Sequence, residues 1–354
     1  MDVREDTVDG FRQVTLHSEE IEVSVLPELG GKLRSLRLAG HPHNVLLEPP
    51  EFRYRRASTG AAFEAFDTSG FDECFPTVAA STSPDDSEVA LPDHGFLWTS
   101  EWTCEPDDAG LRMEARLPGQ PWRFTRQLRI SGRTLRLEYE LASQAQRPLR
   151  YLWSAHPLLA ASVGSSIHLP SEVRAVFVQY SRGDRVGRHG AEIGWPHPGM
   201  DVLRGPETGW AEKLFTPRLA EGWCAFHHAA SGVWVRFRFD PQRTPYLGLW
   251  ICQGGWPESR VSRHFTVALE PTSGRPDALA EAAHRGECAR LEAGETSRWA
   301  LEIELGQAPI ERSMEKRSIR LPDGRTLIFY TFPDPAPPQA REPPTPPVRR
   351  RDDV

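Results

Sequence analysis

Residues 135–141 read LRLEYEL, with leucine or tyrosine at every odd position and a charged residue at every even position. A period of two puts apolar side chains on one face of a β-strand and charged side chains on the other. The same period recurs in residues 21–25 (IEVSV), 233–239 (VWVRFRF) and 301–305 (LEIEL). These runs predict strands that each pack one face against a core.

Turn-forming residues separate the predicted strands. Ser131-Gly132-Arg133 precedes the 135–141 run, and Pro322-Asp323-Gly324 divides two apolar runs near the C-terminus. Only residues 277–291, which follow Pro276 and are rich in alanine, are typical of a helix. Many short strands with few short helices predict an all-β protein, most simply a large antiparallel β-sandwich.

The composition predicts three parts. No linker-like stretch interrupts the strand pattern up to about residue 305, so we expect one sandwich domain over residues 1–312. Residues 313–332 predict an appended pair of strands. Residues 333–354 contain eight prolines and little apolar surface, which predicts a disordered tail.

Charge and composition argue against several classes of protein. The chain has 354 residues and a net charge of −7, and a mildly acidic surface repels phosphate backbones, so we expect no nucleic-acid partner. No run approaches the ~18 apolar residues of a membrane span. The N-terminus is acidic and lacks the apolar segment of a secretory signal, so we expect a cytoplasmic protein. The five cysteines form no C-x-x-C pair, which argues against a zinc knuckle or a redox motif.

Four segments combine carboxylates, histidines and aromatic residues: 70–77 (GFDECFPT), 91–98 (LPDHGFLW), 151–158 (YLWSAHPL) and 267–274 (VALEPTSG). Each also has a purely structural interpretation. The carboxylates of the first segment are explained by an exposed turn, and the second by a turn that its aspartate caps. A histidine beside a proline is common at a strand end, and a glutamate that closes an apolar strand must reach solvent or a partner. Three tryptophans in segments bounded by Gly or Pro could stack on a sugar ring: Trp98, Trp250 and Trp256.

Taken in order, the segments resemble the aldose 1-epimerase (galactose mutarotase-like) family. The matching pieces, spread over roughly residues 11–305, are 27–33 (PELGGKL), 71–76 (FDECFP), 93–95 (DHG), 153–157 (WSAHP), 247–250 (LGLW) and 269–271 (LEP). The chain lacks the Asn-Arg pair that well-known galactose mutarotases carry before their first histidine, and it lacks the Arg that the hexose-6-phosphate branch carries after its His-Gly. It is therefore similar to a less characterised branch, and a phosphosugar substrate is not indicated.

The resemblance implies a concave sheet face that binds a free monosaccharide and interconverts its anomers without a metal or organic cofactor. It implies Glu270 as the base and His156 as the acid, with His94 close to the ring oxygen. Asp72, Glu73, Trp98 and Trp250 are the further sugar-binding candidates. Since a base and an acid must reach one sugar ring, we expect the Glu270 carboxylate and the His156 ring within about 10 Å of each other.

Two other functions remain open at this point. The first is a carbohydrate-binding or sensing protein without catalysis, built on the same sandwich. The second is a metal-dependent β-barrel enzyme with His94, His156 and Glu270 as ligands of the two-histidine, one-carboxylate type. The expected partner in the main interpretation is a monosaccharide, and the expected state is a monomer or homodimer.

Overall fold

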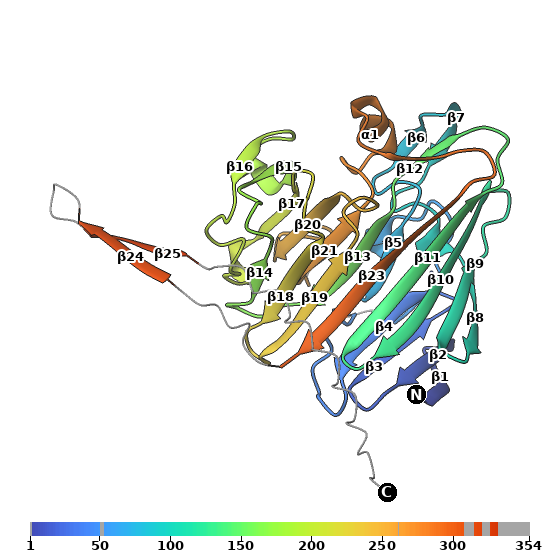
Figure 1. Cartoon of the computed structure of the whole chain (residues 1–354), viewed down its shortest axis with the longest axis horizontal. Coiled ribbons are helices and arrows are strands. Elements are labelled where there is room, and N and C mark those ends of the chain that lie inside the picture. Colours follow the sequence, from blue (N-terminus) through green and yellow to red (C-terminus); the bar gives the residue numbers. More distant parts are fainter. Residues whose placement is uncertain (1, 50–52, 261, 308–314, 321–325, 332–354) are drawn as a thin grey trace, which may run out of the picture. The chain divides into compact units, whose positions relative to one another are not determined.

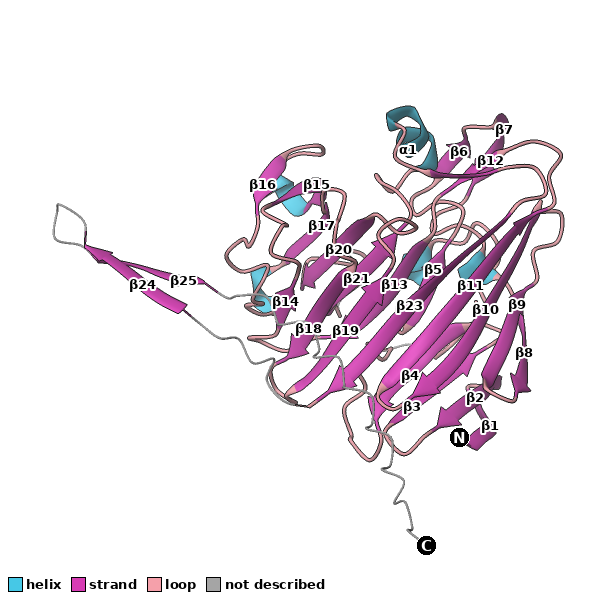
Figure 2. Cartoon of the chain, viewed as in Figure 1, coloured by secondary structure: helices cyan, strands magenta, loops and turns pink. Residues whose placement is uncertain are grey.

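The computed structural model describes residues 2–49, 53–260, 262–307, 315–320 and 326–331. It divides into two units, residues 1–310 and residues 311–354. The first unit consists of two large β-sheets, and every ladder between its named strands is antiparallel (Figure 2). The prediction of an all-β, antiparallel sandwich is confirmed.

The first sheet has eleven strands and carries the candidate site. Four of its ten neighbouring strand pairs are not consecutive in the chain, so distant segments meet on one surface (Figure 1). The order is β1 (Asp2–Val8), β2 (Phe11–His17), β3 (Ile21–Leu26), β4 (Lys32–Leu38), β5 (Phe71–Cys74), β13 (Ser154–Ala160), β21 (Phe265–Thr272), β20 (Tyr246–Gln253), β17 (Trp210–Phe215), β15 (Ala175–Ser181) and β16 (Glu192–Gly194).

The second sheet has eight strands, in the order β14 (Ser166–His168), β18 (Trp223–His228), β19 (Val233–Phe239), β23 (Thr296–Gly306), β11 (Thr134–Ser143), β10 (Trp122–Ser131), β9 (Gly110–Ala115) and β8 (Trp102–Asp107). Two short ladders complete the unit: β6 (Ser81–Ser83) with β7 (Asp86–Leu91), and β12 (Leu149–Tyr151) with β22 (Ala289–Leu291).

The core lies between the two sheets and follows the period of two. Along β11 every odd residue from Leu135 to Ser143 is buried and every even residue is partly exposed. The buried leucines and aromatics of β11, β10 and β23 pack with inward side chains of β4, β20 and β21 in one continuous cluster. The alternation seen in the sequence is therefore the inside and outside of a two-layer structure.

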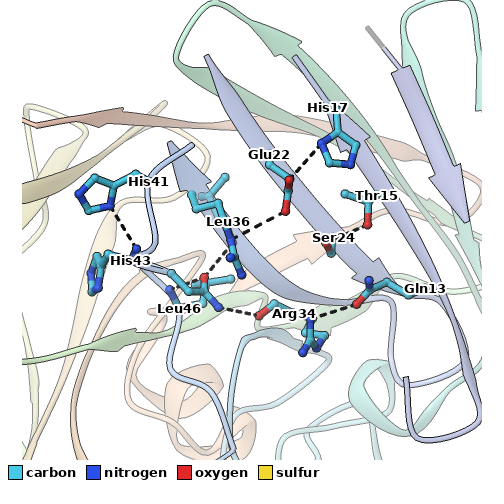
Figure 3. A network of polar contacts seen from close by, with 12 residues as sticks. Gln13, Thr15, His17, Glu22, Ser24, Arg34, Leu36, His41, His43 and Leu46 are labelled. Atoms are coloured by element: carbon cyan, nitrogen blue, oxygen red, sulfur yellow. Dashed lines mark hydrogen bonds and ion pairs between the residues drawn. The ribbon is translucent and has the colours of Figure 1, made fainter. Parts of the chain in front are cut away.

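Polar contacts join β2, β3 and β4 on the face that points away from this core (Figure 3). Thr15 and Ser24 share a hydrogen bond of 2.9 Å across β2 and β3, and His17 Nδ1 lies 3.0 Å from the Glu22 carboxylate. Arg34 of β4 donates to Gln13 of β2 at 3.2 Å. These side-chain contacts hold the register of strands whose other face is fixed by apolar packing.

The helical segment is shorter than the sequence predicts. α1 spans Leu279–Arg285, and Gly286 ends it with a left-handed φ of 70°. Glycine adopts this conformation without strain, and it closes the helix in a C-terminal cap. Residues 289–291, predicted as helix, form strand β22 and pair with β12. Four short 3₁₀ segments complete the described helices: η1 (Phe63–Ala65), η2 (Leu97–Thr99), η3 (Arg182–Asp184) and η4 (Pro206–Thr208).

In the second unit, β24 (Glu315–Arg320) pairs antiparallel with β25 (Thr326–Thr331), in the region where the sequence predicts two strands. The turn at 322–324 and the predicted tail, 333–354, lie outside the described residues. The described part of the chain contains no helix with the length and apolarity needed to cross a bilayer.

Candidate active site

The candidate site lies on the face of the first sheet that points away from the core. A cavity of about 420 Å³ opens there, and side chains of β13, β21, β20 and β17 form its floor. Four of the predicted site residues line this cavity: Glu270, His156, His94 and Trp250. A larger depression of about 710 Å³ lies over β10, β11, β23 and β19, but no histidine is among its described lining residues.

The register of β13 and β21 brings Glu270 and His156 together. Ser154 pairs with Thr272 and Leu158 with Ala268, so the residues midway between these pairs stand opposite each other. His156 Nε2 lies 3.8 Å from Glu270 Oε1, with side-chain exposures of 8% and 1%. The two residues are distant in sequence, and the expected proximity of about 10 Å is met.

Two prolines shape the strands at this point. The sequence places Glu270 at the end of its strand, but β21 continues through Pro271 to Thr272, and β13 likewise continues through Pro157. Both prolines lie in the interval where the β13–β21 ladder has no backbone pair. Since proline has no N–H to donate, the ladder is interrupted there while the strands run on.

Lys213 of β17 holds the other carboxylate oxygen. Its ammonium group donates to Glu270 Oε2 and lies 3.7 Å from Asp277 Oδ1. The strand between them carries Gly248 opposite Glu270. A Cβ at Gly248 would lie 3.0 Å from Glu270 Oε2 and 3.3 Å from Lys213 Nζ, so a side chain here would crowd the contact. Glu270 Oε1 has no hydrogen-bond partner among the described residues.

Burial and charge set the ionisation of this cluster. Burial raises the pKa of Glu270, and the positive charge of Lys213 opposes that rise. Burial alone would lower the pKa of Lys213, but Asp277 and Glu270 outweigh it and raise the pKa. Burial, together with the charges of His94 and Lys213, lowers the pKa of His156 well below its usual value. Lys213 is therefore a cation at neutral pH and His156 is an uncharged imidazole.

His94 enters the cavity from a tight turn. Its own φ is 60° and that of Gly95 is 70°. A Cβ at Gly95 would lie 1.9 Å from the Phe75 carbonyl oxygen, so only glycine fits there. Asp93 Oδ2 lies 2.9 Å from His94 Nδ1, and the His94 ring stacks on Phe63 with centroids 4.1 Å apart. The His94 and His156 rings meet edge to face at 5.2 Å.

Aromatic side chains line the opposite end of the cavity. Trp250 of β20 meets Trp256 edge to face at 5.9 Å, and Tyr180 of β15 lies 6.4 Å from Trp250. The sequence singled out Trp250 and Trp256, and both line the cavity.

Three predicted sugar-binding residues do not line the cavity. Asp72 and Glu73 are not in an exposed turn but in β5, where both are buried and point to opposite faces of the sheet. Asp72 accepts from Lys32 Nζ at 2.5 Å. Glu73 accepts from Arg126 at 2.9 Å between the sheets. Trp98 packs edge-on against Phe63 with ring centroids 5.2 Å apart, and it is Phe63 that lines the cavity.

Sequence reasoning missed Lys213, Asp277 and Phe63. Lys213 belongs to the strand WAEKLF, where two adjacent charges interrupt an apolar run. That interruption was an available signal, because a charge inside a buried strand needs a partner. The sequence predicts that the helix starts at Asp277, after Pro276, but α1 begins two residues later.

Within the described ranges, no group of three or more His, Cys, Asp or Glu side chains is arranged to hold a metal ion. Glu270 Oε2 is engaged by Lys213 rather than directed at the histidines.

Comparisons with solved structures identify proteins that share this fold. No family model matches the chain, and no curated protein matches it. Among solved structures, a protein of Klebsiella pneumoniae described as a "putative aldose 1-epimerase" aligns with a TM-score of 0.65 at 13% identity, over 87% of this chain and 83% of that chain. A galactose mutarotase related enzyme of Lactobacillus acidophilus aligns with a TM-score of 0.61 at 14% identity, over 84% of this chain and 99% of that chain.

The fold is the galactose mutarotase-like fold. A third structure, a galactose mutarotase-like protein of Clostridium acetobutylicum, aligns with a TM-score of 0.58 at 11% identity over 86% of this chain and 98% of that chain. At these identities the likeness concerns the architecture, and the chemistry must be argued from the side chains of the site.

Proposed function

We propose that this protein is an isomerase that interconverts the anomers of a free sugar. The observation that carries the proposal is the buried Glu270 carboxylate at the floor of the cavity. One of its oxygens is held by Lys213 and the other, without a hydrogen-bond partner among the described residues, lies 3.8 Å from His156. A positioned carboxylate beside imidazoles in an aromatic-lined cavity suits proton transfer on a sugar.

The reaction needs two proton transfers around C1. Glu270 Oε1 takes the proton of the C1 hydroxyl, and the electrons of that O–H bond form the carbonyl of the open-chain aldehyde. The C1–ring-oxygen bond breaks, and its electrons go to the ring oxygen. An imidazolium gives its proton to the ring oxygen as that bond breaks. Rotation about C1–C2 and the reverse transfers close the ring as the other anomer, and atoms and charge balance.

Two histidines are candidates for the acid. The sequence favours His156, and that assignment stays a prediction. Burial holds His156 uncharged, whereas Asp93 lies 2.9 Å from His94 Nδ1, where it can stabilise an imidazolium. We therefore assign proton donation to His94 and a hydrogen bond to the sugar to His156. His94→Asn should then lower kcat more than His156→Asn, and the reverse order would return the acid role to His156.

Lys213 fixes which carboxylate oxygen can act. Its charge opposes the rise of the Glu270 pKa that burial causes, and its ammonium group donates to Oε2. Lys213 is the one lysine or arginine among the described residues that line the cavity, and Glu270 and Asp277 both neutralise it. The cavity therefore suits an uncharged sugar rather than a phosphosugar.

The same contact favours a second candidate, a carbohydrate-binding protein without catalysis, because an ion pair with Lys213 weakens Glu270 as a base. Polarimetry on freshly dissolved α-D-glucose and α-D-galactose, with tryptophan fluorescence as a binding assay, separates the two. An isomerase speeds the approach to anomeric equilibrium over buffer in proportion to protein concentration. Fluorescence changes without any acceleration would overturn the proposal and establish the binding protein.

A further inference from the structure

An aromatic surface extends the cavity beyond Glu270 and the two histidines. Tyr180, Trp250 and Trp256 form it, at the end opposite His94 and Phe63. Tyr180 is 42% exposed, which is unusual for a large side chain in this protein. Exposed aromatic rings next to a sugar site offer flat apolar faces for a further ring.

The strand order shows that Tyr180 is too distant for the ring that reacts, whereas Trp250 lies on β20, next to the strand of Glu270. β21, which carries Glu270, and β15, which carries Tyr180, are three strand steps apart. At about 4.8 Å per step, roughly 14 Å separates these strands, whereas a pyranose is about as wide as one step. Tyr180 pairs with Lys213 and Lys213 pairs with Trp250, so the three residues form a row across β15, β17 and β20. The row extends the cavity floor toward β15.

The surface is held in place by contacts outside the catalytic cluster. Arg182, two residues after Tyr180, forms a 2.9 Å ion pair with Glu258, two residues after Trp256. The backbone N–H of His264 donates to the Trp256 carbonyl at 2.8 Å, and the His264 ring meets the Trp256 ring edge to face at 5.1 Å. The contacts with His264 hold Trp256 in position, and an aromatic ring that is already positioned loses little entropy when a ligand stacks on it.

We propose that Tyr180, Trp250 and Trp256 form a second sugar subsite, and that the substrate is the reducing end of a disaccharide or longer saccharide. The inference rests on the proposed function, because C1 of the first ring must lie at Glu270. The glycosidic link then leaves from a hydroxyl on the far side of that ring, and the second ring stacks on the aromatic surface. The cavity of about 420 Å³ has the size of sites that enclose ligands larger than one sugar ring.

The test compares sugars that share a reducing end. α-D-Glucose is paired with maltose and lactose, and D-galactose with β-1,4-galactobiose. Anomer exchange is followed by NMR and binding by tryptophan fluorescence. We expect at least one disaccharide to show a kcat/KM about tenfold or more above that of its matched monosaccharide.

Two variants of one exposed residue test the stacking. Tyr180→Ala removes the ring, and Tyr180→Phe keeps it. Tyr180→Ala should lower kcat/KM for the preferred disaccharide about five- to tenfold more than for the monosaccharide, the size of one aromatic stacking contact. Tyr180→Phe should retain the disaccharide preference.

The outcomes separate this inference from the proposed function. If no sugar is equilibrated faster but a disaccharide binds more tightly than its monosaccharide, and Tyr180→Ala removes that difference, the isomerase proposal fails and the second subsite stands. Equal kcat/KM values within each pair, a preference for monosaccharides, or no binding of any member overturns the second subsite.

Discussion

Two buried ion pairs each join a glutamate to a cationic side chain, but one lies between the two sheets and the other in the cavity on the outer face. Glu73 and Arg126 meet at 2.9 Å between the sheets, with side chains 0% and 1% exposed. Arg126 also donates to the Gly31 carbonyl, and its guanidinium lies 5.0 Å from the Trp102 ring. Glu270 and Lys213 are almost as deeply buried, but both line a cavity that also holds two histidines.

The comparison shows that burial of a carboxylate does not by itself identify a catalytic group. The carboxylate between the sheets is surrounded by packed aromatic core, so its pair connects the two layers. One oxygen of each carboxylate has no hydrogen-bond partner among the described residues, but that of Glu270 lies 3.8 Å from His156, and both residues line the cavity. The difference follows from the direction in which each strand points its side chain. It predicts that mutation of the pair between the sheets lowers stability, whereas mutation of the pair in the cavity changes the pH dependence of activity.

The largest expected effect on stability comes from the pair between the sheets. Arg126→Met leaves Glu73 as an uncompensated buried charge, which costs about 3–5 kcal/mol of unfolding free energy. Urea denaturation followed by tryptophan fluorescence measures it. Arg298→Met is the matched control, because Arg298 is 70% exposed in its pair with Glu140 and should cost less than about 1 kcal/mol. A loss as small as that of the control would refute a connecting role for Arg126.

The second prediction concerns the pair in the cavity and is read in the pH dependence of activity. Glu270 acts as a base only when ionised, so kcat/KM falls on the acid side as Glu270 protonates. Lys213 opposes the rise of the Glu270 pKa that burial causes. Lys213→Met removes this opposition, raises that pKa further and moves the acid limb to higher pH.

Lys213→Arg keeps the charge and is the matched control, with an acid limb close to that of the wild type. Should the limb of Lys213→Met stay in place, Lys213 would have no part in holding Glu270 ionised.

The smallest expected effect concerns Asp72, on the same face as the cavity but outside it. Burial raises the pKa of Asp72 from 3.8 to about 6. Because the folded state then holds this proton more tightly than the unfolded state, stability falls as pH rises through about 6. Asp72→Asn should flatten this dependence in melting temperatures measured from pH 4.5 to 7.5. The change should stay below that of Arg126→Met, because Lys32 keeps Asp67 at 2.9 Å. An unchanged slope would contradict the assignment to Asp72.

The sequence predicts the architecture well because alternation is a local property. Residues 135–141 and 233–239 show which side chains face the core without any knowledge of the partner strands. Glu270, His156 and His94 line one cavity, and their grouping came from the resemblance and not from periodicity.

The rest depends on strand order, which no local pattern contains. Lys213 reaches Glu270 only because β20 lies between their strands and carries a glycine at the crossing point. Asp72 and Glu73 are adjacent in sequence, so the sequence gives them one role, but alternation in β5 sends them to opposite faces. The three-strand distance to Tyr180 is likewise visible only in the assembled sheet.

The most direct test of the account is the rate of anomer exchange by Glu270→Gln, measured by NMR and normalised to folded protein. The amide keeps the shape and hydrogen-bonding capacity of the side chain but removes its basicity. The account predicts a kcat lower than that of the wild type by ~10²–10⁴-fold, with sugar binding retained in the fluorescence assay. A Glu270→Gln variant that equilibrates the sugar as fast as the wild type would contradict the assignment of Glu270 as the base.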